Sequence, residues 1–284
     1  MKIVRFLGGL GNQMFQYAFY KSLEQTGADV RADINGYQTY SLHNGFELED
    51  LFNIRLKKVG PFISSLYDSS NRKWHLRKLR QIMGLKKAYY EQASPFEFDP
   101  SVYENKQGLY WGYWQNVSYV EPVSNLLRKD FIFKRTPKSA STSIFDDIKN
   151  SNSVSLHIRR GDYLKDPLLG GICGIAYYQN AVNLLKEHYN DLKFYIFSDD
   201  ITWSEKNLPI PGAVFVKGNE GTYSFADMHM MSICKHNIIA NSSFSWWGAW
   251  LNINSNKIVI APKKWVNITS ITTDNITPSS WIKI

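Results

Sequence analysis

Cysteine is scarce in this sequence, and long apolar runs are missing. The only two cysteines, Cys173 and Cys234, form no CxxC pair or Cys/His cluster, so neither a disulfide framework nor a structural zinc site is predicted. The longest apolar runs, such as Phe244 to Leu251, are too short to span a bilayer. The first residues also lack the apolar stretch and cleavage site of a signal peptide. We therefore expect a cytoplasmic protein without a transmembrane helix.

The charge of the chain is biased toward cations. The formal net charge of +8 favours anionic partners, such as phosphorylated donors, nucleic acid or the inner leaflet of a membrane. Much of the excess lies within residues 72–87, where Arg and Lys alternate with apolar residues at roughly helical spacing. Two interpretations stay open for this segment. It is either a solvated helix face over ordinary core contacts, or a surface for peripheral docking on the inner face of a membrane.

The first half of the chain begins as a βαβ unit. We expect a strand over Lys2–Leu7, a glycine-rich turn over Gly8–Asn12, a helix over Gln13–Thr26 and a strand over Ala28–Asp33. Residues 36–125 are rich in aromatics and are assigned to the same domain without a topology. The length of 284 residues suits two compact domains, and a polar stretch from Pro137 to Ser153 places their boundary near residue 150.

In the second half, strands and helices alternate regularly. Strands are expected at Ser153–Ile158, Lys193–Phe197, Ala213–Val216, Asn237–Ala240 and Lys257–Ile260, and helices at Ala176–Tyr189, Tyr223–Cys234 and Phe244–Ile253. Such alternation predicts a parallel sheet covered by helices, which binds ligands beyond the carboxyl ends of its strands. Polar sequences follow three of these strands: His157–Asp162, Ser198–Asp200 and Asn241–Ser243.

Two guanidinium groups, those of Arg159 and Arg160, are concentrated at one predicted strand end, in the sequence LHIRRGDY. Arginine presents paired donors that match phosphate oxygens, so it can neutralise a departing diphosphate where other enzymes use magnesium. The alternative is a surface pair that closes a turn against Asp162. The position at a strand end favours the phosphate-binding interpretation.

A second candidate anion site lies where Ser242 and Ser243 precede the last predicted helix. Hydroxyl groups and free backbone N–H groups at a helix N-terminus bind anions, although Ser caps helices in the same position.

Asp227 suits the donor edge of guanine if a nucleobase is bound, and is otherwise an ordinary helix residue. We expect Trp246, Trp247 and Trp250 to pack in the core. Asn12 ends a glycine-rich turn that lacks the full GxGxxG spacing, and it could donate an amide hydrogen bond to a ligand.

Three segments together resemble a known enzyme family. GGLGNQMFQYAF, SLHIRRGDY and NSSFSWWGAWL, with GYWQ at 112–115 and FSDD at 197–200, are similar to α-1,2-fucosyltransferases of glycosyltransferase family eleven. The order and spacing match over nearly the whole chain. Two positions depart from the pattern. Gly9 stands where many relatives have Arg, so any role of that Arg falls elsewhere or is missing, and Trp114 stands where many have Phe.

The resemblance implies a GT-B-like α/β fold, with two Rossmann-type domains facing across a cleft. Residues 1–150 would form the acceptor side, and residues 151–284 would bind GDP-β-L-fucose. The implied reaction is an inverting transfer of L-fucose to the 2-hydroxyl of a galactose residue in a glycan, without a metal or other cofactor. By position, Arg159 would hold the β-phosphate, with Arg160 either beside it or structural. His157 and Asp227 would lie at the guanosine, Ser242 and Ser243 at the diphosphate, and Asn12 would reach the donor from the first domain.

The transfer breaks the bond to diphosphate through an oxocarbenium-like transition state. Arg159 and the helix N-terminus at Ser243 would stabilise the negative charge that grows on the leaving group. A carboxylate or a His could accept the proton of the acceptor hydroxyl, whereas a strongly dissociative reaction would need only weak assistance from a base. Asp162 is the candidate we name first, and Asp199, Asp33 and Glu47 remain alternatives.

Other function classes fit parts of the pattern. A nucleotide-sugar-binding regulator without transferase activity would need the same Arg159 and Ser243. Nucleic-acid binding through residues 72–87 ranks last, because no nucleic-acid module accompanies the charge. The acceptor's linkage and the oligomeric state are not predicted.

Overall fold

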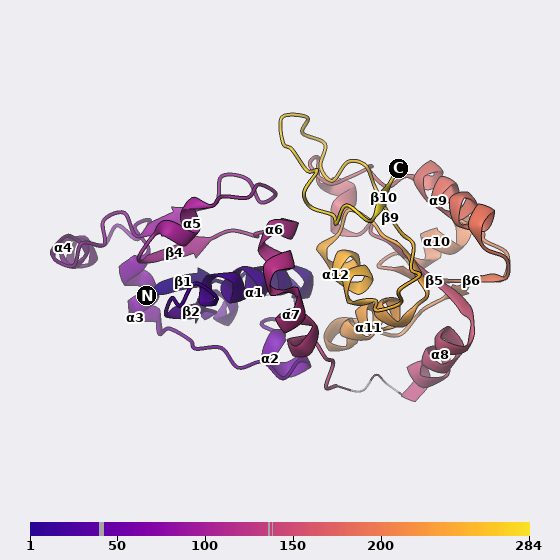
Figure 1. The fold of residues 1–284 in the computed structure, drawn as a ribbon, viewed down its shortest axis with the longest axis horizontal. Coiled ribbons are helices and arrows are strands. Elements are labelled where there is room, and N and C mark those ends of the chain that lie inside the picture. The colour runs from indigo at the N-terminus through magenta and orange to yellow at the C-terminus, as the bar shows by residue number, and fades with distance from the viewer. Residues whose placement is uncertain (40–42, 136, 138) are drawn as a thin grey trace. The chain divides into compact units, whose positions relative to one another are not determined.

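The chain folds into two compact α/β units, Met1–Lys134 and Arg135–Ile284. The computed structural model describes residues 1–39, 43–135, 137 and 139–284 (Figure 1). Residues 40–42 of the aromatic-rich stretch and residues 136 and 138 near the boundary lie outside the described residues. Within the described ranges, no helix combines the length and the apolar character that crossing a bilayer requires.

The first unit is built on a four-stranded parallel sheet in the order β2-β1-β4-β3. The strands are β1 (Lys2–Arg5), β2 (Val30–Asp33), β3 (Tyr89–Glu91) and β4 (Gly108–Trp111). The helices are α1 (Leu10–Glu24), α2 (Leu48–Leu51), α3 (Pro61–Tyr67), α4 (Trp74–Ile82), α5 (Ser101–Glu104), α6 (Val117–Val120) and α7 (Ser124–Asp130). The βαβ unit expected at the start is therefore confirmed.

Helix α1 begins at Leu10, three residues before the expected start, because Gly9 takes the extended N-cap conformation. Asn12 consequently lies in the first helical turn rather than in the preceding turn. The helix is buried nearly all round, so it lies inside the unit rather than on its surface. Phe19 stacks on Trp114, with ring centroids 3.9 Å apart, which joins the helix to the segment after β4.

The second unit holds a six-stranded parallel sheet in the order β10-β9-β8-β5-β6-β7. The strands are β5 (Asn152–Ile158), β6 (Leu192–Ser198), β7 (Val214–Phe215), β8 (His236–Ile238), β9 (Val259–Ala261) and β10 (Ile282–Lys283). The helices are α8 (Ser139–Asn150), α9 (Ile175–His188), α10 (Ile201–Asn207), α11 (Phe225–Ile233) and α12 (Ser243–Leu251). Each expected strand and helix of this half is present, with shifts of at most two residues at its ends.

The division between the units falls at residues 134 and 135, earlier than the boundary expected near residue 150. The polar stretch that suggested a linker instead forms α8. Its Phe145 and Ile148 are buried in a core with Tyr195, Phe197 and Met230 of the second unit. Spacing of three residues places both apolar side chains on one face of the helix, so the segment packs despite its Ser and Thr content.

Helices α11 and α12 pack closely in the second unit. A Cβ added at Gly248 of α12 would lie 2.8 Å from the Cβ of Met231 on α11, so glycine is needed for this approach. Trp246, Trp247 and Trp250 of α12 are buried, which confirms the expected core role for these rings. The N-terminal end of α12 is thereby held at the edge of the sheet where β8 ends.

Candidate functional site

The candidate site lies at the carboxyl edge of the second sheet. Strands β5 and β6 pair in parallel, with Ile158 opposite Ser198. The residues after them, Arg159 and Asp199, are therefore brought side by side. Strand β8 pairs on the other side of β5, and its chain continues to Asn241 and α12. The three polar sequences singled out along the chain thus follow adjacent strands.

Arg159 is held between two carboxylates. Its Nη2 lies 2.8 Å from Oδ1 of Asp162, and its Nη1 lies 3.1 Å from Oδ2 of Asp199. The guanidinium carbon also lies 5.5 Å from the centre of the Tyr163 ring. The Arg159 side chain is 29% exposed, so solvent or a ligand can reach the cation. Since two acids already orient the guanidinium, an incoming phosphate would meet a positioned donor pair.

Arg160 is bound differently. Its Nε lies 3.3 Å from Oδ2 of Asp200, and its guanidinium stacks 3.6 Å above the ring of Trp203. Asp200 in turn caps α10 by accepting a hydrogen bond from the Trp203 backbone N–H at 3.1 Å. These contacts give Arg160 a structural role in joining the ends of β5 and β6.

Asp199 supports the loop after β5 through both of its carboxylate oxygens. Its Oδ2 pairs with Arg159, and its Oδ1 accepts the backbone N–H of Arg160 at 2.8 Å. A Cβ added at Gly161 would lie 2.8 Å from Oδ2, so a side chain there would require this carboxylate to move. The sequence indicated Asp199 only as a possible proton acceptor, because its contacts with this loop depend on the pairing of β5 with β6.

His157 is a buried, neutral imidazole next to this loop. It is 5% exposed, and its ring centroid lies 6.0 Å from that of Phe244 in α12. Burial, with a smaller contribution from the charge of Arg159, lowers the pKa of His157 to about 3. Its Nδ1 is buried and has no hydrogen-bond partner among the described residues. A buried polar atom without a partner costs free energy, and a bound ligand that donates to it would remove that cost.

Ser242 and Ser243 lie where α12 begins. Ser242 is the N-cap residue, with extended backbone angles, but its hydroxyl makes no cap hydrogen bond. Ser242 instead interacts with the Tyr163 hydroxyl, whose own pKa burial raises to about 12. The Tyr163 hydroxyl also donates to the Asn241 carbonyl at 3.3 Å. The capping alternative therefore does not describe the Ser242 side chain, and Tyr163 links the arginine loop to the start of α12.

Asp227 lies in the first turn of α11. Its Oδ1 accepts a hydrogen bond from Nδ2 of Asn219 at 2.7 Å. Burial raises the pKa of Asp227 to about 7, although the Asn219 hydrogen bond lowers it and the charge of Glu220 raises it further. A partly desolvated carboxylate that titrates near neutrality is a common feature of binding sites.

Asn12 lies in the first unit, on α1. Its Oδ1 accepts a hydrogen bond from Nε2 of Gln115 at 2.8 Å. Gly8 has a φ of +79°, and a Cβ there would lie 2.6 Å from Nδ2 of Asn12. The GGLGNQ and GYWQ segments are thus joined within this unit by a side-chain hydrogen bond. The role of Asn12 at a donor stays a prediction.

The sequence analysis missed two other residues of the site. Tyr163 follows the HIRRGD motif directly, so its neighbourhood was visible in the sequence, but its contacts with Asn241 and Ser242 depend on the tertiary fold. Asn219 lies in the loop before α11, in no motif, and its pairing with Asp227 carries no sequence signal. Among the residues that the structure describes, no three His, Cys, Asp or Glu side chains gather in a way that could hold a metal ion.

Comparisons with known proteins give a consistent result. A family model described as Glycosyl transferase family 11 matches residues 1–284. An Escherichia coli α-1,2-colitosyltransferase is 35% identical over 297 residues, which covers 99% of this chain and 98% of that protein. The Escherichia coli O-antigen biosynthesis glycosyltransferase WbnK is 32% identical over 299 residues, with 98% of each chain covered. Mouse galactoside α-(1,2)-fucosyltransferase 1 is 25% identical over 260 residues, 86% of this chain and 61% of its own length.

Solved structures show the same fold. The crystal structure of the α-1,6-fucosyltransferase NodZ soaked with GDP-fucose matches with a TM-score of 0.51 at 14% identity, covering 88% of this chain and 92% of NodZ. This likeness confirms the GT-B-like α/β fold expected from the sequence. With the family model matching over the full length, the chain belongs to glycosyltransferase family 11 and is a glycosyltransferase.

Proposed function

We propose that this glycosyltransferase transfers L-fucose from GDP-β-L-fucose to the 2-hydroxyl of a galactose residue, with inversion at the anomeric carbon. The observation that carries the proposal is the placement of Arg159 between Asp162 and Asp199 at the carboxyl edge of the second sheet. A cation fixed in this way stabilises charge that develops on a leaving diphosphate without reorganising during the reaction. The resemblance of this loop to the fucosyltransferase motif supports the same role.

The donor contacts follow from the residues around this loop. Arg159 would hold the β-phosphate, with Arg160 fixing the loop behind it. The hydroxyl groups of Ser242 and Ser243 and the backbone N–H groups at the start of α12 would bind the diphosphate oxygens. Helix α12 has no acidic residue in its first turn that would oppose an anion there.

The guanosine would lie near His157 and Asp227. A carboxylate accepts both donors on the edge of guanine, which adenine and uracil do not present in the same pattern. The Nδ1 of the neutral His157, which has no partner among the described residues, can pair with a ligand hydroxyl, as acceptor or donor according to the tautomer. Asn12 would contact the donor from the first unit.

In the transfer, the bond between the anomeric carbon and the β-phosphate oxygen breaks, and its electron pair stays on that oxygen beside Arg159. The acceptor's 2-hydroxyl oxygen bonds to the anomeric carbon from the opposite face, and its proton passes to a base or to water. Asp162 is the first candidate for this base that was predicted from the sequence. Its side chain is 59% exposed and pairs with Arg159. A bound phosphate would replace Asp162 as a partner of Arg159. The reaction as proposed uses no metal, because Arg159 and the start of α12 supply the positive charge.

The 35% identity to a colitosyltransferase supports GDP-colitose as a second candidate donor. Colitose is L-fucose without the 3-hydroxyl group, so the two GDP-sugars would present the same nucleotide and differ at one position of the sugar. The similarity to a protein of O-antigen biosynthesis further supports a bacterial glycan as the acceptor.

The test is incubation of the protein with GDP-fucose or GDP-colitose and either a β1,3- or a β1,4-linked galactoside, followed by measurement of released GDP and product mass. With GDP-fucose as the donor, the product should be about 146 Da heavier than the acceptor, which is the mass of one deoxyhexosyl residue. Product from GDP-colitose alone would transfer the assignment to the second donor. Donor binding without product from any acceptor would instead favour a nucleotide-sugar-binding regulator.

A further inference from the structure

The cationic segment, residues 72–87, carries almost all of the protein's excess charge. Between Ser69 and Tyr90 there are seven cations, and there is no Asp or Glu: Arg72, Lys73, Arg77, Lys78, Arg80, Lys86 and Lys87. The whole chain has a formal net charge of +8, so the rest of the sequence contributes only +1. The charge is therefore a local feature and is not spread over the protein.

Helix α4 is attached to the first unit through one face. Leu76 is buried in a core cluster with Leu66 and Leu85. The guanidinium of Arg80, one turn later, is also buried and donates to the backbone carbonyls of Ser65, Leu66 and Asp68 at 2.6 to 2.9 Å. Arg80 is thus part of the fold, and the other six cations of the segment are exposed.

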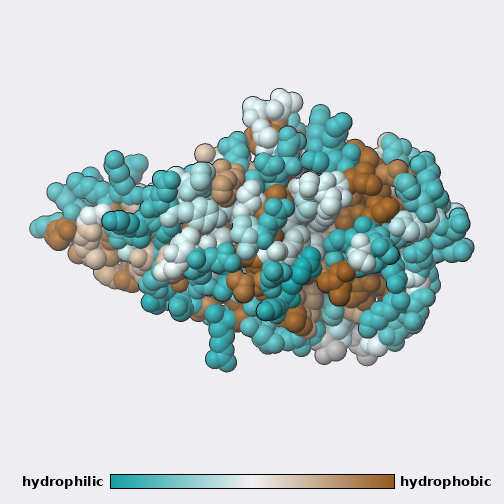
Figure 2. Space-filling view, in the orientation of Figure 1, coloured by the Kyte–Doolittle hydropathy of each residue, from teal (hydrophilic) through white to brown (hydrophobic). Residues whose placement is uncertain are grey.

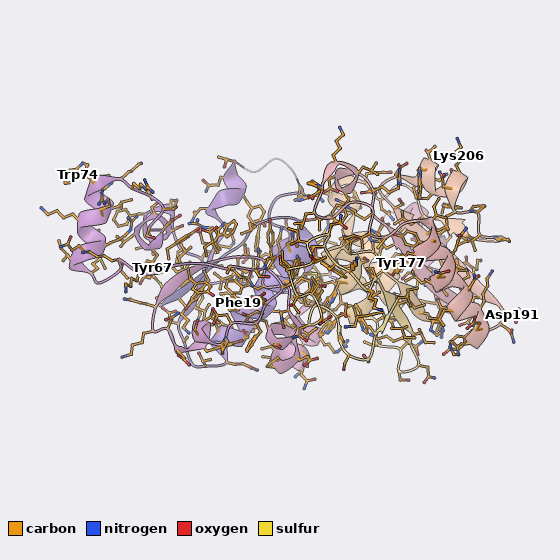
Figure 3. The ribbon with its side chains drawn as sticks, turned by 90° about the horizontal axis from the view of Figure 1, so that it is seen from above. Phe19, Tyr67, Trp74, Tyr177, Asp191 and Lys206 are labelled. Atoms are coloured by element: carbon orange, nitrogen blue, oxygen red, sulfur yellow. The ribbon has the colours of Figure 1, made fainter. Side chains whose placement is uncertain are left out.

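The opposite face of α4 is both cationic and apolar. Trp74, Lys78 and Ile82 follow one another at intervals of four residues, so they form one stripe along the helix. Trp74 is 75% exposed, Ile82 is 73% exposed, and Met83 after the helix is 52% exposed. In Figure 3, Trp74 marks this helix at the left edge of the view, and Figure 2 shows hydrophobic surface beside hydrophilic surface at the corresponding end.

The exposed cations of the segment have no acidic partner in the part of the chain that the structure describes. None of the ion pairs found within the described residues includes Arg72, Lys73, Arg77, Lys78, Lys86 or Lys87. Unpaired cations around exposed Trp and Ile match the chemistry of an anionic bilayer surface. Lys and Arg bind the phosphate headgroups, and Trp and aliphatic side chains enter the boundary of the acyl chains.

We propose that the outer face of α4, with the flanking cations of residues 72–87, docks the protein on membranes that contain anionic phospholipids. A polynucleotide would use the cations and could stack a base on Trp74, but it would give no role to the exposed aliphatic side chains of Ile82 and Met83. The inference is independent of the proposed transfer, since the candidate donor residues other than Asn12 lie in the second unit.

Co-sedimentation of the full chain with lipid vesicles tests the proposal. Equal parts of phosphatidylcholine and phosphatidylglycerol should bind the protein, pure phosphatidylcholine should not, and added salt should weaken the binding. The triple variant Lys78→Ser/Lys86→Ser/Lys87→Ser should bind anionic vesicles about a hundredfold more weakly, because each cation near an anionic surface contributes roughly fivefold to affinity. The control Lys106→Ser/Lys206→Ser/Lys264→Ser removes the same charge from exposed positions outside the segment and should bind like the unchanged protein.

The apolar stripe needs its own variant. Trp74→Ser/Ile82→Ser should bind anionic vesicles at least tenfold more weakly, whereas the control Ile132→Ser/Ile253→Ser removes two other exposed apolar side chains and should not. Circular dichroism checks that each variant is folded. Equal vesicle binding by the segment variants and their controls would overturn the proposal. So would binding that depends on the lysines but not on Trp74 and Ile82 and is matched by polyuridylate, because that pattern indicates a general polyanion surface.

Discussion

Asp199 fixes the direction of Arg159: Oδ2 of the carboxylate lies 3.1 Å from Nη1 of the guanidinium, while the other oxygen accepts the Arg160 backbone N–H. The contact joins the ends of β5 and β6, two adjacent strands that pair along their whole length. A flexible side chain that binds a diphosphate loses less entropy when it is already held in place. The donor affinity and the rate of transfer should therefore depend on a residue that need not touch the sugar.

Replacing Asp199 tests this dependence. The Asp199→Asn variant keeps an oxygen for the Arg160 N–H but loses the charge that orients Arg159. We expect kcat/KM for the donor to fall about tenfold to a hundredfold, the usual worth of a hydrogen bond to a charged group. Steady-state kinetics would measure it, with Asp146→Asn on the exposed face of α8 as the matched control. Unchanged kinetics in Asp199→Asn would show that Arg159 does not need this support.

The two arginines of the loop should behave differently when each is replaced. Arg159→Ala should lower kcat by about two to three orders of magnitude, as the loss of a transition-state donor does. The kcat of Arg159→Lys should lie between that of Arg159→Ala and that of the unchanged protein, since lysine keeps the charge and loses the paired donors. Arg160→Ala should act mainly on stability, because it removes the stack on Trp203 and the pair with Asp200. Thermal unfolding beside turnover separates the two effects, and near-normal turnover in Arg159→Ala would contradict its assignment.

Guanine binding should depend on pH through Asp227. Its pKa is about 7, above the ordinary value, so the carboxyl is protonated below neutrality and must lose a proton before it can accept two hydrogen bonds from guanine. GDP affinity should therefore rise about tenfold between pH 6 and pH 8. Calorimetry across this range would measure the change. The Asp227→Asn variant reports the titration of GDP itself, and an equally steep curve in that variant would contradict the role.

Chelation tests the metal-free reaction. If Arg159 and the start of α12 supply the positive charge, turnover should survive a millimolar excess of EDTA with less than about a twofold change. Initial rates before and after chelation, and after addition of Mg²⁺ or Mn²⁺, would measure this. Complete loss of turnover that a divalent cation restores would require a metal in the mechanism.

Much of the second unit could be predicted from the sequence, because its strands and helices alternate regularly and polar clusters follow three of the strands. His157–Asp162, Ser198–Asp200 and Asn241–Ser243 follow β5, β6 and β8, which are adjacent in the sheet. Parallel strands bring their carboxyl ends to one edge, so the neighbourhood of Arg159 follows from the pattern. The contacts of Asp199 depend on the register of β5 against β6, which the pattern does not give.

Other features depend on tertiary contacts that no local pattern shows. Helix α8 resembles a linker by its polar residues, although Phe145 and Ile148, with the partly buried Ile144, pack against the core. Trp114 has a φ of +57°, unusual for a residue other than glycine. Its backbone N–H, with that of Tyr113, donates to Oε1 of Gln92 at 3.0 Å. A side chain on another segment thus fixes the GYWQ loop, a contact that the local sequence does not show.

The central claim is that the second unit binds a guanine diphosphate through Arg159. Titration calorimetry of the full chain with GDP, UDP and ADP tests it most directly. We expect binding of GDP, at least tenfold weaker binding of UDP and ADP, and a large loss of GDP affinity in Arg159→Ala while the fold is retained. A correctly folded sample that gives no heat with GDP, or that binds all three nucleotides equally, would contradict the account.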